Sequence, residues 1–331
     1  MTAAGEAPVL VAPDSFKGTF AAIEVAAALA HGLRRGGRDA VEMPIGDGGE
    51  GTMDALLAAR GGERVEATAP DPIGRPVATQ FSLLPGGRTA VVETAQASGL
   101  HHVAEDERDA WAASTRGTGE LIAAAARAGA SEVIVTVGGS ATTDGGAGAL
   151  EALSEADVGV ELVVVCDVRT PWEDAARVFG PQKGADPELV ARLERRLEHL
   201  ADAAPRDPRG VPMTGCAGGL SGALWAHRGA RLVPGAAFVL DEVGFDAVMH
   251  GARFAVTGEG RLDEQTLAGK AVAEIATRCR QAGVACHAVV GEERLEPFQA
   301  RVLDLASVAE ATTITELEDA GAAIAVASRP G

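Results

Sequence analysis

Short apolar runs alternate with amphipathic stretches along most of the chain. The first run, Val9–Ala12, ends in a polar loop, after which apolar side chains recur at helical spacing. The same order of strand, loop and helix is predicted at Glu132–Val137 with Ala147–Leu153, at Glu161–Val165, and at Phe254–Val256 with a long helix from about Thr266 to Arg280. Such alternation is typical of an α/β fold with a mostly parallel sheet.

One region has a different pattern. Between Glu63 and Glu93, three β-rich runs are separated by Pro/Gly turns, which predicts an antiparallel meander with strands at Arg64–Ala67, Val77–Leu83 and Thr89–Glu93. A chain of 331 residues exceeds one ordinary core, so two domains are expected. We predict a discontinuous Rossmann-like α/β domain at 1–62 plus 252–331 and an inserted α/β domain with a mixed sheet at 63–251. The Pro-containing stretch Ala201–Val211 is predicted to be a loop.

Composition narrows the range of partners. A formal charge of −18 opposes binding to nucleic acid or to an anionic membrane surface. No apolar run is long enough to span a membrane, and the N-terminus shows no signal-peptide pattern. The four cysteines lack metal-ligand spacing and are expected to be buried thiols. These features predict a cytoplasmic protein that acts on a small molecule, while an oligomer stays possible.

Lysine is unusually rare in this chain. There are three lysines among 29 basic residues, and each adjoins a glycine: Lys17, Lys183 and Lys270. Arginine supplies the general surface charge, so lysine is left for tasks that need a compact, rotatable ammonium group in a confined space. Because the protein is acidic, an anionic substrate needs a local positive pocket, and the lysines are candidates to form it. A codon bias toward arginine is the alternative explanation.

Glycine, hydroxyl and carboxylate side chains gather in the loops that follow the predicted strands. In open α/β sheets, ligands bind at the carboxyl ends of strands. Glycine lets backbone N–H groups approach an anion, and nearby carboxylates can hold Mg²⁺ or accept a proton. This combination suits phosphoryl transfer. These side chains lie in the loops 14–18, 46–52, 138–146 and 257–263, and at Asp167.

Each loop also has a simpler interpretation. Gly138–Gly146 is neither a P-loop nor a dinucleotide-binding fingerprint, and it can be an ordinary glycine-rich turn. The acidic residues can be helix caps, first-turn acids or turn residues. The histidines are expected to have structural or surface roles, and Trp111, Trp172 and Trp225 are expected to pack.

Six blocks, in the same order, resemble the bacterial glycerate kinase family, of the glycerate 2-kinase type. The resemblance covers about Val9 to about Gly291 and includes all three lysines. Its blocks are Ala12–Gly18, Gly46–Thr52, Val137–Gly146, Phe179–Ala185, Ala217–Leu220 and Thr257–Lys270. It implies ATP-dependent phosphorylation of D-glycerate, with Mg²⁺, at an active site in the cleft between two α/β domains, and it makes the 2-hydroxyl the expected acceptor.

Roles follow as hypotheses on this resemblance. The predicted catalytic residues are Lys17, Asp47, Asp167 and Lys270, with Asp47 and Asp167 also predicted as metal ligands. The predicted ATP-binding residues are Gly138, Gly139, Ser140, Asp144, Lys183 and Glu259. The predicted substrate-binding residues are Asp14, Ser15, Glu50 and Asp263.

The chain departs from the family pattern in three places. The connection Ser154–Gly159 is compressed, the segment Thr170–Ala176 lacks the glycines expected after Asp167, and the region after Gly291 is shortened. A catalytically impaired or re-targeted homologue that binds nucleotide or another small hydroxy acid is therefore the alternative function. An NAD-dependent dehydrogenase is disfavoured because no strand is followed by G-x-G-x-x-G.

Overall fold

The computed structural model describes residues 6–16, 18–267 and 269–328. The chain divides into two compact units, and each contains its own sheet. Unit 1 comprises residues 1–47, 54–59 and 236–331, and unit 2 comprises residues 48–53 and 60–235. The domain boundaries predicted from the sequence, and the predicted cleft between the domains, stay predictions.

Unit 1 contains a five-stranded sheet with the order β11-β10-β9-β1-β2, in which all described pairs are parallel. Its strands are β1 (Val9–Pro13), β2 (Ala40–Glu42), β9 (Ala255–Glu259), β10 (Cys286–Val290) and β11 (Ser307–Glu310). Its helices are α1 (Ala22–Arg35), α9 (Gly235–Glu242), α10 (Phe245–His250), α11 (Glu264–Leu267), α12 (Ala271–Ala282), α13 (Pro297–Leu303) and α14 (Ile314–Ala327). The helix α2 (Thr52–Arg60) contributes to both units.

Helices cover both faces of this sheet. Along β1, Val9 and Val11 pack with α1 and α14, whereas Leu10 and Ala12 pack with α9, α10 and α12. A strand that is buried on both faces has no polar side to expose, so its sequence is continuously apolar. This is why the pattern identified β1 correctly.

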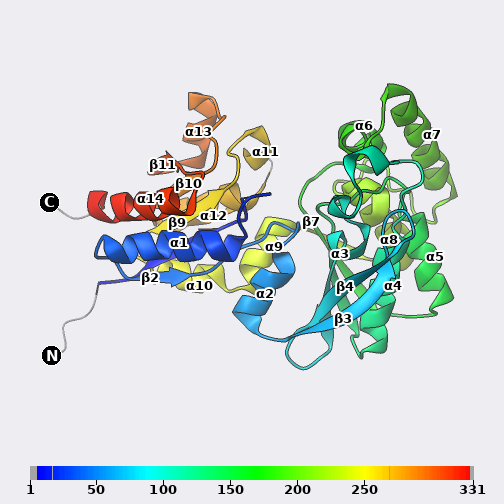
Figure 1. The fold of residues 1–331 in the computed structure, drawn as a ribbon, viewed down its shortest axis with the longest axis horizontal. Helices are drawn as coiled ribbons and strands as arrows, with labels where there is room; N and C mark the ends of the chain where they lie inside the picture. Colours follow the sequence, from blue (N-terminus) through cyan, green and yellow to red (C-terminus); the bar gives the residue numbers. More distant parts are fainter. Residues whose placement is uncertain (1–5, 17, 268, 329–331) are drawn as a thin grey trace. The chain divides into compact units, whose positions relative to one another are not determined.

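Helices α1 and α14 lie side by side in unit 1 (Figure 1). Their close approach requires glycine, because a Cβ atom at Gly32 would lie 1.9 Å from the carbonyl oxygen of Glu318. The N-terminal and C-terminal parts of the chain are therefore packed into one core.

Unit 2 contains a six-stranded mixed sheet with the order β3-β4-β5-β6-β7-β8. The pairs β3–β4 and β4–β5 are antiparallel, which confirms the predicted meander, and the remaining pairs are parallel. The strands are β3 (Glu63–Pro70), β4 (Pro76–Leu83), β5 (Thr89–Glu93), β6 (Glu132–Thr136), β7 (Glu161–Cys166) and β8 (Arg231–Pro234).

The helices of unit 2 are α3 (Ala95–Ser98), α4 (Arg116–Arg127), α5 (Ala147–Glu155), α6 (Ala175–Phe179), α7 (Pro187–Ala203) and α8 (Leu220–Arg228). Short 3₁₀ turns are η1 (Leu100–His102), η2 (Glu105–Glu107), η3 (Trp172–Asp174), η4 (Pro181–Lys183) and η5 (Cys216–Gly219). Helices α4, α5 and α8 share a core with β4 to β7.

Two predicted elements need correction. The single helix expected from Thr266 to Arg280 is two helices, α11 and α12, because the backbone at Gly269 has a φ of +107°, outside the helical region. The loop expected at Ala201–Val211 begins later, because α7 continues to Ala203 and buries Ala201.

Candidate active site

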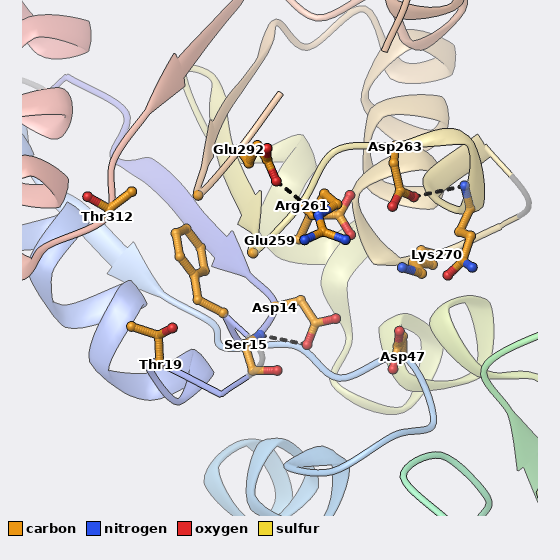
Figure 2. A pocket seen from close by; sticks show the side chains of 14 residues that line it. Asp14, Ser15, Thr19, Asp47, Glu259, Arg261, Asp263, Lys270, Glu292 and Thr312 are labelled. Carbon is orange, nitrogen blue, oxygen red and sulfur yellow. Dashed lines mark hydrogen bonds and ion pairs between the residues drawn. The ribbon is translucent and has the colours of Figure 1, made fainter. Parts of the chain in front are cut away.

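A cavity of about 430 Å³ lies at the carboxyl ends of the strands of unit 1. It is lined by residues that follow β1, β2, β9, β10 and β11, so every strand of the sheet contributes to it. The chain order reverses between β1 and β9, which makes this edge the topological switch point where α/β sheets bind ligands. Figure 2 shows ten labelled side chains around the cavity.

Buried carboxylates dominate the lining of this cavity. Asp14, Asp47 and Glu259 have only 4%, 3% and 5% of their surface exposed. The carboxylate of Asp14 accepts a 2.7 Å hydrogen bond from the backbone N–H of Ser15, which fixes the turn after β1. Such carboxylates can hold a cation or accept a proton only if ligands reach them, and the cavity provides that access.

Glu259 is held by the loop that leads into α11. The hydroxyl of Thr266 donates to Glu259 Oε1 at 2.6 Å and accepts from the N–H of Asp263 at 3.2 Å. Burial raises the pKa of Glu259 from an ordinary 4.5 to about 7, against the lowering effects of the Thr266 hydrogen bond and the positive charge of Lys270. Its carboxyl group is therefore close to half-protonated at neutral pH, as suits a group that exchanges a proton.

Two cations also line the cavity in the described part of unit 1: Lys270 and Arg261. Lys270 is the N-cap residue of α12, so its position is set by the start of a twelve-residue helix. The guanidinium Nε of Arg261 donates to Glu292 at 3.1 Å, as Figure 2 shows. These charges can offset the nearby carboxylates and accept an anionic ligand.

A second group of predicted residues lies in unit 2, where β6 and β7 end. The backbone N–H groups of Val137 and Gly138 both donate to the carbonyl oxygen of Gly48 at 3.1 Å. A Cβ atom at Gly138 would lie 2.5 Å from Gly49 Cα and 3.2 Å from Asp167 Oδ2. Glycine is thus required here because the two loops and the Asp167 carboxylate approach closely.

Lys183 lies at the centre of this second group. Its ammonium donates to Ser140 Oγ at 3.1 Å and to the carbonyl oxygen of Thr142 at 2.6 Å, and the residue is 2% exposed. Burial lowers the pKa of Lys183 to about 8, although the negative charges of Asp144 and Asp167 act in the opposite direction. Contact between Lys183 and an anionic ligand stays a prediction.

Asp144 acts as a structural cap. One or other of its carboxylate oxygens accepts from the backbone N–H and the hydroxyl of Thr115, both at 2.8 Å, from Gly146 at 3.0 Å and from Gly148 at 3.2 Å. These bonds join the start of α5 to the start of α4. The capping interpretation, left open by the sequence, therefore has direct support, and contact between Asp144 and a nucleotide stays a prediction.

The predicted residues thus fall into two groups. The cavity of unit 1 contains Asp14, Ser15, Asp47, Glu259, Asp263 and Lys270. Unit 2 contains Glu50, Gly138, Gly139, Ser140, Asp144, Asp167 and Lys183. Lys17 lies outside the described residues.

Sequence reasoning missed several residues that line the cavity: Thr19, Arg261, Gln265, Glu292 and Thr312. Two of these residues could have been identified from their positions after predicted strands. Glu292 and Thr312 follow the carboxyl ends of β10 and β11, where side chains join a site regardless of their motif.

The expectation for the cysteines is confirmed, since all four are free and buried. Trp172 packs in the core at 3% exposure, as expected, whereas Trp111, also expected to pack, is 41% exposed and lies beneath the guanidinium group of Arg192. In the described ranges, no helix combines the length and apolarity needed to cross a bilayer.

The profile of the glycerate kinase family matches residues 9–158 and 154–325. A glycerate kinase from Bacillus subtilis (strain 168) is 38% identical over 325 residues, covering 86% of this chain and 84% of that protein. A glycerate 2-kinase from Escherichia coli (strain K12) is 36% identical over 301 residues, covering 79% of each.

The structural comparison gives the same result. The crystal structure of a glycerate kinase 2 from Salmonella typhimurium LT2 superimposes with a TM-score of 0.81 at 30% identity, covering 97% of this chain and 98% of that one. The family match continues past Gly291 to residue 325, and its two parts meet at residues 154–158, within the connection expected to be compressed. The chain therefore belongs to the glycerate kinase family.

Proposed function

We propose that this protein transfers the γ-phosphoryl group of ATP to the 2-hydroxyl group of D-glycerate, giving 2-phosphoglycerate. The observation that supports this most is the cavity of unit 1, where buried carboxylates and two cations gather at the carboxyl ends of five parallel strands. Phosphoryl transfer needs positioning and charge stabilisation more than covalent chemistry, and this lining supplies both.

Each type of group has a proposed task. Lys270, Arg261 and Lys17 bind the anionic oxygens of glycerate or of the transferring phosphoryl group. Asp47 and Asp167 are the proposed base and metal ligands. Glu259, with a pKa of about 7, is a further group that can take the proton of the attacking hydroxyl.

The unit 2 loop has the proposed task of holding the nucleotide. Gly139 and Ser140 offer backbone N–H groups, while Gly138, whose own N–H donates to Gly48, allows the close approach of the loops. Lys183 adds a positive charge next to Ser140 Oγ, at 3.1 Å. Asp14, Ser15, Glu50 and Asp263 are the proposed contacts to the small hydroxy acid.

The donor set fits magnesium. Carboxylate oxygens line the cavity, and Mg²⁺ in kinases is usually held by one or two carboxylates together with substrate phosphates and water. In the described residues, no group of three or more His, Cys, Asp or Glu side chains is arranged to hold a metal. We therefore propose Asp47 and Asp167 as candidate carboxylate ligands, each considered within its own unit, for a Mg²⁺ bound with the nucleotide. Such an ion would supply charge neutralisation for the phosphoryl group.

A single incubation tests the proposal. The protein is mixed with ATP, Mg²⁺ and D-glycerate; ADP is followed by a coupled assay, and the product is identified by phosphorus NMR. We expect ADP release that depends on D-glycerate and on Mg²⁺, and a phosphate resonance of the 2-phosphate ester. A 3-phosphate ester would refute the regiochemistry, and release that is indifferent to D-glycerate would refute the substrate.

The alternative is a family member that binds these ligands without transfer. The compressed connection between α5 and β7 favours this alternative. It leads into β7, and Asp167, a proposed catalytic residue, directly follows that strand, so a change in the connection can alter the position of Asp167. Thermal stabilisation by ATP or D-glycerate with no ADP release would establish this alternative.

A further inference from the structure

A histidine lies at the rim of the glycine-rich loop of unit 2, and the assignments above leave it without a function. His101 belongs to η1, and this turn is fastened to the loop on both sides of Ser140. The N–H of Leu100 donates to the carbonyl oxygen of Gly139 at 2.9 Å, and the N–H of Ala141 donates to that of Ser98 at 2.9 Å. An isolated β-bridge also joins Gly99 to Ser140. The imidazole is therefore carried by backbone that is directly bonded to the proposed nucleotide loop.

The imidazole ring is packed tightly against this backbone. A Cβ atom at Gly99 would lie 2.9 Å from His101 Nδ1 and 2.8 Å from its Cε1. The backbone of Gly99 has a φ of −78°, which any residue adopts, so space and not conformation requires glycine here. One edge of the ring therefore lies close to the Gly99 backbone, next to the carbonyl oxygen of Ala95.

Glu50 approaches the same ring from the loop that precedes α2. Its Oε1 lies 3.7 Å from His101 Nδ1 and would lie 2.5 Å from a Cβ atom at Gly139. Glu50, Gly139 and His101 therefore form one compact group. Because Glu50 faces the Nδ1 side, the Nε2–H of the ring is the donor that can meet a ligand.

The ring remains accessible, and its surroundings favour the charged form. The side chain of His101 is 55% exposed. The nearby carboxylate of Glu50 raises the pKa of His101 above its usual 6.5, although partial burial acts in the opposite direction. The ring of His102 packs against it in a tilted arrangement, with ring centroids 4.1 Å apart and an interplanar angle of 41°. The ammonium of Lys183 contacts the other side of this loop through Ser140 Oγ.

We propose that His101 is a substrate-binding residue whose imidazolium donates from Nε2 to an anionic oxygen at the Gly138–Ser140 loop. This inference rests on the proposed function. The anionic oxygen belongs to a phosphate of ATP or to the carboxylate of the hydroxy acid. A charge-assisted hydrogen bond of this kind contributes more than a neutral one, so its loss is measurable in KM.

The test compares H101Q with H102Q. Glutamine keeps a donor but removes the charge. His102 is a matched control because its Nε2 is already engaged by the carbonyl oxygen of Gln96 at 2.9 Å. We expect H101Q to raise the KM for ATP or for D-glycerate by roughly five- to tenfold with a smaller change in kcat, and H102Q to stay within twofold of wild type. The substrate whose KM rises identifies the anion that His101 binds.

Measuring KM over a series of pH values separates the effect of the charge of His101 from the effect of its shape. The KM of the wild type should rise as the pH passes the raised pKa of His101, whereas H101R, which keeps its charge, should hold a flatter KM from pH 6 to 9. Both H101Q and H101R should keep the wild-type Tm, because the side chain is largely exposed. If both KM values of H101Q are unchanged in an active enzyme, the inference is wrong. If the wild type shows no turnover at all, the proposed function fails instead.

Discussion

The buried carboxyl group of Glu259 is predicted to lower the stability of the protein when it is ionised. A substitution at this position can measure that cost separately from any role of the group in catalysis. The perturbation is Glu259→Gln, which removes the titration and keeps an oxygen that can accept the 2.6 Å hydrogen bond from Thr266. A pKa of about 7 in the folded protein, against an ordinary 4.5, corresponds to roughly 3 kcal/mol at 1.36 kcal/mol per pKa unit.

The sign follows from proton binding. Below pH 4.5 the carboxyl group is protonated in both the folded and the unfolded chain, so it has no effect on the pH dependence. Between pH 4.5 and about 7 the unfolded chain loses the proton first, and the wild type loses stability as the pH rises. Above pH 7 the full penalty of burying the charge is present. The glutamine variant has no such penalty.

Differential scanning calorimetry at a series of pH values measures this effect. Unit 1 has about 150 residues, for which 1 kcal/mol changes Tm by roughly 2–4 °C. We expect E259Q to melt roughly 6–12 °C above the wild type at pH 8 in the transition of unit 1, and to match it at pH 4.5. Equal pH profiles for the two proteins would show that burial does not control this carboxyl group. Turnover is measured in parallel, because a proton-accepting role predicts that the more stable variant is slower.

Three further substitutions test unit 2. Lys183→Met should remove a rise in stability between pH 8 and 10.5 that the wild type shows in urea unfolding, because the buried ammonium deprotonates at about pH 8; a wild-type profile that is flat over this range would contradict the reasoning. Asp144→Ala should lower the free energy of unfolding by about 3 kcal/mol or more, because it leaves four donors from Thr115, Gly146 and Gly148 without their acceptor. The control Asp202→Ala, at an exposed position, should change the free energy of unfolding by less than about 0.5 kcal/mol. Asp167→Asn should reduce turnover by about 100-fold without changing Tm, and near-normal turnover would remove Asp167 from the proposed catalytic set.

The strands were the most predictable part of the fold. β1 and the parts of β6 and β7 that follow Glu132 and Glu161 are buried and read as largely apolar runs. β9 is buried too, but only Ala255 and Val256 continue its apolar pattern. The meander was marked by its Pro/Gly turns. The break between α11 and α12 was not foreseen, because a single glycine inside a helical pattern is often tolerated. The positive φ of Gly269 became known only from the structure.

The candidate site was predictable in residue type but not in detail. The motif positions identified carboxylates that do reach the cavity. The sequence could not distinguish a cap from a ligand at Asp144, because both tasks use the same side chain. It also passed over Arg261, since arginine supplies general surface charge throughout this chain. The pKa of Glu259 depends on burial by distant segments, which no local pattern reveals.

The central place of β1 has a consequence for synthesis on the ribosome. β1 emerges first, but one of its two neighbours, β9, begins only at Ala255, and the helix that packs against α1 begins at Ile314. Residues 60–235 can therefore form their own core while one edge of β1 is still unpaired. The second edge of β1 can pair only after β9 has been synthesised, so the sheet of unit 1 is completed after the segment that forms most of unit 2.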